Sequence, residues 1–346
     1  MIFLNYLNFK LLYIFSFNLF NKFFIIWNLI NFALIPLFFY DLIMIWFFME
    51  INNFLFICYL SMKLTNKKII FLYYLIQEIA SLMLMFSLSM NNFFFLNNDF
   101  LNLNFLIALM MKLGIPPFHL WMPIVSLFFS WDILFLFLTI QKIIPFYMLS
   151  IIEMKKSILY FMILMSSFIP TFKMINLLNF KLLLTYSSIN QSSWMLMLIF
   201  LKTLFWLIYM IFYSLILFII SLFLIYFKFS FNFFLNNFSS LNFNLISLML
   251  MFNLASIPPL SFFLMKWLSI YIFIFNSNLH LIFILMMLNS FILIFIYINL
   301  MNLTMFFFIF KTKLINNSIN FKYFNFKNLS TYMYFSFLLS LMIFLI

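Results

Sequence analysis

The chain has 346 residues, of which 68% are hydrophobic and only 7% are charged, with a formal net charge of +12. A soluble domain carries roughly 25% charged residues, so this sequence lacks the polar side chains needed to cover a water-facing surface. Its lysines lie in short groups between apolar runs, the pattern that orients membrane proteins. This distribution argues against nucleic-acid binding.

Apolar runs of about 20 residues, long enough to cross a bilayer, recur along the chain. They are continuous and not alternating, which predicts helices and excludes a β-barrel. We therefore expect an all-α, polytopic integral membrane protein with about 10–11 transmembrane helices. In chain order, the expected spans are residues 23–40, 42–61, 69–90, 103–124, 130–151, 157–174, 181–200, 203–227, 245–275, 280–309 and 331–346.

The inventory of possible ligands bounds the cofactor chemistry. The chain has one cysteine, Cys58, and two histidines, His119 and His280. An iron–sulfur cluster or a structural zinc site needs about four ligands, and Gly-rich phosphate loops need several glycines, whereas Gly114 is the only glycine. We expect no cofactor and no metal on this chain.

Four ionisable residues lie inside apolar runs and not at their ends: Glu50, Lys112, Lys142 and Lys266. A charge at the centre of a spanning helix costs about 2.5–3.5 kcal/mol on insertion scales. A single lysine of this kind could reach the interface with its long side chain or form a structural ion pair. Four such residues, three of them beside prolines, favour a polar pathway.

Prolines interrupt the helices near these lysines, with breaks expected at Pro116, Pro117, Pro145, Pro258 and Pro259. A proline leaves the carbonyl four residues earlier without its helical partner, so Pro116 frees the carbonyl of Lys112. A carbonyl exposed in hydrocarbon needs water or a side-chain donor, and a hydrated lysine supplies one. An apolar environment disfavours the charged form of an ammonium group, which suits a lysine to a proton relay.

Other polar residues have weaker interpretations. His119, two residues after the Pro-Pro pair, is a further candidate member of the relay. Glu78, in YLIQEIASLML, could be an extra intramembrane carboxylate or could lie near the start of its helix, and a structural role is favoured. Asp132 stands where a helix is expected to begin, which favours a capping role.

Six segments, in order, resemble those of NADH dehydrogenase subunit 2, the mitochondrially encoded, antiporter-like membrane subunit of respiratory complex I. The three longest are MKLGIPPFHLWMP (111–123), LLTYSSINQSSWM (183–195) and IPPLSFFLMKW (257–267). WFFMEIN (46–52), YLIQEIAS (74–81) and LTIQKIIP (138–145) fit the same family. The resemblance covers about residues 42–310. We expect one transmembrane domain over 1–346, with an N-terminal extension (1–22), an antiporter-like core with two proline-broken helices (23–310), and a loop and C-terminal helix (311–346).

The resemblance implies that Glu50, Lys112, Lys142 and Lys266 form a proton relay along the membrane midplane, driven by quinone reduction elsewhere in the complex. It further implies other membrane-arm subunits and lipids, cardiolipin among them, as partners. NADH, FMN, iron–sulfur clusters and ubiquinone would be bound by the complex, not by this chain. The expected location is the mitochondrial inner membrane. The absence of arginine and the abundance of Met and Phe, 27 and 61 residues, fit an AT-rich animal mitochondrial gene.

The chain departs from the family pattern at several positions. LASIPP replaces a Gly-rich turn before the second Pro-Pro pair, Phe262 replaces a glycine, and Gln191 replaces a histidine. A carboxylate and another glycine are replaced by Ile124 and Ser193. Two alternatives therefore stay open: a freestanding cation/proton antiporter of the related class, and a structural spacer subunit that does not conduct protons.

Overall fold

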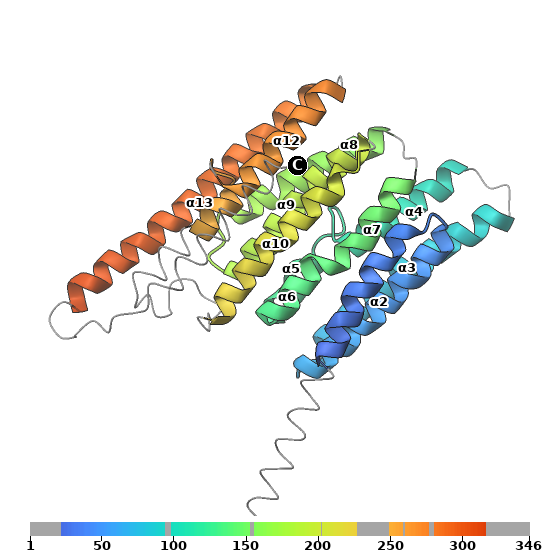
Figure 1. Cartoon of the computed structure of the whole chain (residues 1–346), viewed down its shortest axis with the longest axis horizontal. Helices are drawn as coiled ribbons and strands as arrows, with labels where there is room; N and C mark the ends of the chain where they lie inside the picture. The colour runs from blue at the N-terminus through green and yellow to red at the C-terminus, as the bar shows by residue number, and fades with distance from the viewer. Residues whose placement is uncertain are drawn as a thin grey trace, which may run out of the picture. The chain divides into compact units, whose positions relative to one another are not determined.

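The computed structural model describes residues 22–93, 98–152, 156–201, 203–226, 249–258, 260–276 and 280–315, and these are predominantly helical (Figure 1). Helical residues 22–34 lead into a 3₁₀ turn, η1 (Ile35–Phe38). The longer helices that follow are α2 (Leu42–Lys63), α3 (Lys67–Phe93), α8 (Lys156–Met174), α9 (Phe180–Phe200), α10 (Phe205–Tyr226) and α13 (His280–Ile315). The shorter ones are α4 (Asn98–Leu113), α5 (Trp121–Phe128), α6 (Trp131–Leu138), α7 (Ile140–Ile151) and α12 (Ser261–Asn276).

Among the described residues, six helical stretches are long and apolar enough to cross a membrane, and three shorter apolar helices accompany them. The all-α, multi-pass fold predicted from the sequence is confirmed. Ten of the predicted spans have helical counterparts in the described ranges, whereas the span 331–346 and residues 1–21 of the extension 1–22 lie outside them.

Many exposed side chains of these helices are large and apolar. On α13, for example, Leu281, Ile284, Leu288 and Phe291 recur every three or four residues and are 52–70% exposed. This spacing places them along one face of the helix. An apolar face that is exposed in the isolated chain is expected for a helix that borders lipid or another membrane subunit.

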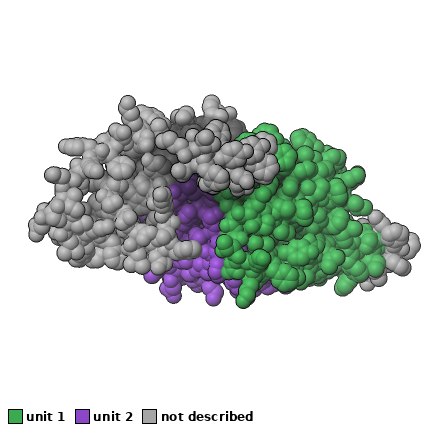
Figure 2. All heavy atoms as spheres, turned by 90° about the horizontal axis from the view of Figure 1, so that it is seen from below, with its two compact units in different colours: residues 1–114, 136–153 green, residues 115–135, 154–346 purple. Residues whose placement is uncertain are grey.

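The chain divides into two compact units, coloured separately in Figure 2: Met1–Gly114 with Leu136–Glu153, and Ile115–Phe135 with Met154–Ile346. In unit 1, α2 packs against α3 and α7, and α4 packs against α3 and α7. Rings from three of its segments meet in the core, where Phe56 lies 5.3 Å from Tyr73 and 6.3 Å from Phe137 between centroids. The prediction of one transmembrane domain stays a prediction.

In unit 2, α9 is the central helix. It contacts α5, α8, α10 and α12, and α8 also packs against α13. Nearly every side chain from Phe180 to Ile199 is buried, although the segment contains seven Ser, Thr, Asn and Gln residues: Thr185, Ser187, Ser188, Asn190, Gln191, Ser192 and Ser193. A helix that is buried on all sides and yet polar has to satisfy these groups within the protein.

Candidate functional site

The first helix break forms around the only glycine in the chain. The helix α4 ends at Leu113, and Gly114 takes a left-handed conformation with φ 64°, which glycine adopts without steric cost. Turns then carry the chain through Pro116 and Pro117 to the start of α5 at Trp121. The predicted interruption beside Lys112 is therefore present in the structure.

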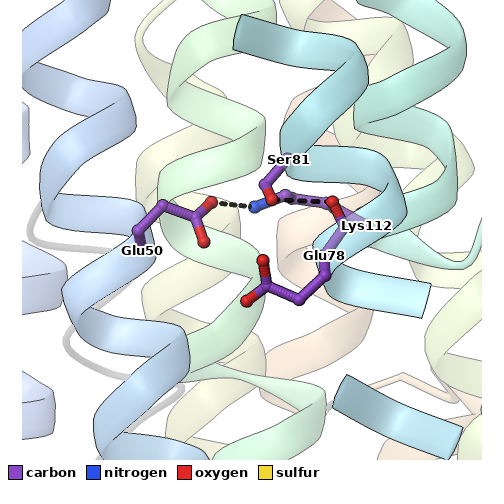
Figure 3. A network of polar contacts seen from close by, with 4 residues as sticks. All are labelled: Glu50, Glu78, Ser81 and Lys112. Carbon is purple, nitrogen blue, oxygen red and sulfur yellow. Dashed lines mark hydrogen bonds and ion pairs between the residues drawn. The ribbon is translucent and has the colours of Figure 1, made fainter. Parts of the chain in front are cut away.

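Lys112, on the last turn of α4, forms an ion pair with Glu50 on α2 (Figure 3). Its Nζ atom donates to Oε1 of Glu50 at 2.6 Å, and the two side chains are 1% and 21% exposed. The pair joins two of the four residues chosen from the sequence, which lie 62 positions apart. In an apolar interior, such a pair is far more favourable than either charge alone.

Two further residues of α3 surround this pair. Figure 3 shows Glu78 with its carboxylate turned toward Glu50 and Lys112. Ser81, one turn further along α3, donates its hydroxyl to the backbone carbonyl of Glu78 at 2.8 Å. Glu78 lies in the middle third of α3, and not near its start, a position that the sequence had left open.

Lys142 lies on α7, which packs against both α2 and α4, the helices that carry the ion pair. Its side chain is 3% exposed. The helix α7 continues through Pro145 to Ile151, so the prediction of a break at this proline is wrong. The interruption lies instead at Thr139, between α6 and α7, where the carbonyl of Thr139 accepts from the amide of Lys142 at 3.0 Å. Pro145 lacks a backbone N–H and so removes only the one helical bond to the carbonyl of Gln141.

Lys266 forms a second site, in unit 2. Its Nζ atom donates to the hydroxyl of Ser256 at 2.8 Å and lies 5.8 Å from the ring centres of Trp194 and Phe262. The lysine is 5% exposed. Aromatic faces attract a cation through their ring quadrupole, so this pocket accommodates an ammonium group without a carboxylate among these contacts.

The second helix break holds Ser256 in place. Helical residues 249–255 end at Ser256, whose φ is 58°, and α12 starts at Ser261. The side chain of Asn253 bridges the break, since its Oδ1 accepts from the Ser261 hydroxyl and from the Phe262 amide, both at 3.2 Å. Asn253 thereby caps the first turn of α12. Pro258 lies within this break, and Pro259 lies outside the described residues.

His119 is 6% exposed and lies in the turn before α5, where its backbone carbonyl accepts from the amide of Met122 at 3.1 Å. Both ring nitrogens are buried without a hydrogen-bond partner within the described ranges. Its membership in the relay stays a prediction. Across the described residues, no group of three or more His, Cys, Asp and Glu side chains could hold a metal ion.

Sequence analysis missed two polar contacts of α9. Lys181, in its first turn and 5% exposed, donates its Nζ to the carbonyls of Leu127 and Phe129 at the end of α5. A lysine at a helix start is unfavourable toward the helix dipole, and this conflict was an available signal. Gln191 accepts from the hydroxyl of Tyr209 at 2.6 Å. No sequence motif predicts this contact.

No protein-family profile matches the chain. It is 33% identical over 129 residues to NADH-ubiquinone oxidoreductase chain 2 of Apis mellifera ligustica, covering 36% of this chain and 38% of that one. It is 37% identical over 99 residues to the chain of the same name from Artemia salina, covering 28% of this chain and 65% of that one. The matched stretches thus span less than two thirds of each relative. The resemblance predicted from the motifs is confirmed over these stretches.

Solved structures share the fold. A chain of respiratory complex I from Thermus thermophilus, with bound aureothin, aligns with a TM-score of 0.60 at 17% identity, covering 75% of this chain and 64% of that one. A chain of the membrane-bound sulfane sulfur reductase, an archaeal respiratory membrane complex, aligns at 0.59 and 15% identity, covering 74% and 60%. A chain of the Mrp complex from Dietzia sp. aligns at 0.56 and 14% identity, covering 70% and 50%. At these identities the likeness establishes the fold alone.

Proposed function

We propose that this chain is a proton-translocating membrane-arm subunit of respiratory complex I, which couples quinone reduction elsewhere in the complex to proton movement through buried Lys and Glu residues. The observation that carries the proposal is the ion pair of Lys112 and Glu50 beside a broken helix. The similarity to chain 2 of NADH-ubiquinone oxidoreductases supports the assignment to that complex.

The chemistry required of the site is the exchange of protons and not bond making. When the Lys112–Glu50 pair opens, each charge loses its main partner, and proton transfer from the ammonium to a carboxylate neutralises both groups. Breaking such a buried pair involves roughly 3–5 kcal/mol. Moving one charge against about 100 mV costs about 2.3 kcal/mol. The two quantities are comparable, so opening and closing this pair is energetically suited to driving a proton step.

Lys142 and Lys266 would continue the relay in the two units of the chain. Each is nearly fully buried on a helix next to an interruption, at Thr139 and at Ser256. A long lysine side chain beside a helix interruption can reach water or a hydroxyl without leaving the protein interior. His119, in the first break, would be a further member.

The proposal includes the surroundings of the chain. Its partners would be the other membrane-arm subunits together with lipids, cardiolipin among them, and its location would be the mitochondrial inner membrane. NADH, FMN, iron–sulfur clusters and ubiquinone would be bound by other parts of the complex. The exposed apolar faces of helices such as α13 support contacts with lipid or membrane subunits.

A freestanding cation/proton antiporter is the second candidate, because the fold is also that of a chain in the Mrp complex, outside complex I. A native gel of source membranes in mild detergent, stained for NADH dehydrogenase activity, separates the two. We expect mass spectrometry to find this chain in the large active band. Its presence only in a smaller, inactive species would overturn the assignment to complex I.

A further inference from the structure

The helix α3 brings a second carboxylate to the Lys112 site. Glu78 is partly buried in the middle third of α3, and Figure 3 shows its carboxylate turned toward the Glu50–Lys112 pair. It lies close enough to act electrostatically on Lys112. The ammonium group is therefore paired with Glu50 on α2 and has a second carboxylate, Glu78 on α3, turned toward it.

The charges of this cluster do not balance. With all three groups ionised, two carboxylates oppose one ammonium, and the site carries one excess negative charge. The two carboxylates therefore compete for a single ammonium group, which pairs with Glu50 in this structure. Other titratable groups on the helices that pack here are Tyr73 on α3, which lies near Glu50, and Lys142 on α7, which packs against α2 and α4.

The position of Lys112 allows its ammonium group to move between the two carboxylates. It lies on the last turn of α4, directly before the interruption at Gly114, and its four-carbon side chain can change rotamer without moving the helix. Its side chain is only 1% exposed, so water does not compete freely for the charge. A protein carboxylate that receives the ammonium is therefore needed whenever the pair with Glu50 opens.

We propose that Glu78 is a second relay carboxylate, and that the Lys112 ammonium alternates between Glu50 and Glu78 as a proton passes through the site. The inference rests on the proposed proton-translocating function. In each cycle, one carboxylate takes up a proton while the ammonium pairs with the other. Release of that proton restores the first carboxylate, so the number of protons entering and leaving the site is equal.

The test uses the assembled complex in its membrane, with proton pumping per electron and its pH dependence as readouts. The variant is Glu78→Gln, which removes the charge at nearly constant shape. Asp41→Asn is the matched control, because this exposed carboxylate precedes α2 and makes no side-chain cap bond. Glu78→Asp tests rescue by the charge alone, and Glu50→Gln with and without Glu78→Gln tests whether the two carboxylates act together.

We expect Glu78→Gln to lower pumping about tenfold or more, as for other acid–base groups, with a shifted pH profile and normal assembly. Glu78→Asp should recover much of this loss. The double variant should be no more than about twofold worse than the more severe single variant, because the two residues act as a unit. A Glu78→Gln variant that matches Asp41→Asn would overturn the inference, as would a double variant whose loss equals the product of the single losses.

A Lys142→Met variant distinguishes a wrong inference about Glu78 from a wrong assignment of the proton-translocating function. If Lys142→Met abolishes pumping while Glu78→Gln leaves it intact, alternation at Lys112 is wrong and the proton-translocating function stands. If pumping persists in Lys142→Met as well, the proposed function itself is wrong.

Discussion

Replacing both partners of the Lys112–Glu50 pair should destabilise the protein by less than the sum of the two single replacements. The Nζ–Oε1 distance of 2.6 Å corresponds to about 6 kcal/mol of attraction at an effective dielectric constant of about 20. Desolvation of the two charges offsets much of this gain, so the net value of the pair is smaller. Removal of one partner leaves the other charge buried, which costs roughly 3–5 kcal/mol.

The variants Lys112→Met and Glu50→Gln each leave such a charge, whereas the double variant removes both. We therefore expect the double variant to cost less than the sum of the two single variants, with a coupling of roughly 2 kcal/mol. Glu78 is unchanged in all three variants, so its contribution is common to the comparison apart from its interactions with Lys112 and Glu50.

Denaturant titration of the assembled complex in mild detergent, followed by the loss of native-gel migration, measures these differences. The wild-type complex and the Asp41→Asn variant serve as references, since Asp41 is exposed and precedes α2. Additivity of the two single effects within about 0.5 kcal/mol would mean that the pair is not coupled. In that case the reasoning from its burial and distance would be refuted.

Three further predictions concern unit 2. Ser256 has φ 58° and accepts from Lys266, so both Ser256→Ala and Ser256→Gly should weaken the complex. The glycine variant should be more stable than the alanine variant by about 1 kcal/mol, because glycine adopts this φ without steric cost. Equal denaturation midpoints for the two variants would contradict this prediction. Tyr209→Phe leaves the buried Gln191 oxygen without its donor and should cost about 1–3 kcal/mol in the same titration, an effect that is absent if the oxygen finds another donor. Phe262→Ala removes a fully buried ring and should cost about 3–5 kcal/mol; a cost below about 1 kcal/mol would show that the second break is loosely packed.

The sequence predicted the helical spans well because apolar length is a direct physical requirement for crossing a bilayer. It also predicted the first break, since Gly114 and two prolines stand together after Lys112. It could not predict which carboxylate meets Lys112, because Glu50 lies 62 positions away and the pairing depends on how α2 and α4 pack. The placement of Glu78 beside the same lysine depends on packing in the same way.

Other differences between prediction and structure have local causes. Pro145 does not mark a break, since a helix that loses one hydrogen bond can continue when packing against its neighbours stabilises it. The interruption lies at Thr139, where the sequence has no proline or glycine that would predict it. The second break uses Ser256 at positive φ where the family pattern has a Gly-rich turn, and Asn253 supplies the cap. Only the three-dimensional arrangement reveals that these polar side chains compensate for the missing glycines.

The most direct test of the proposed function is the number of protons pumped per electron by membranes that contain the assembled complex with Lys142→Met. Lys142 is 3% exposed and lies on α7, next to both helices of the Lys112–Glu50 pair. A proton-translocating subunit predicts that pumping and coupled turnover are lost while assembly on a native gel stays normal. Unchanged pumping in a normally assembled complex would contradict the proposal and identify the chain as a structural spacer.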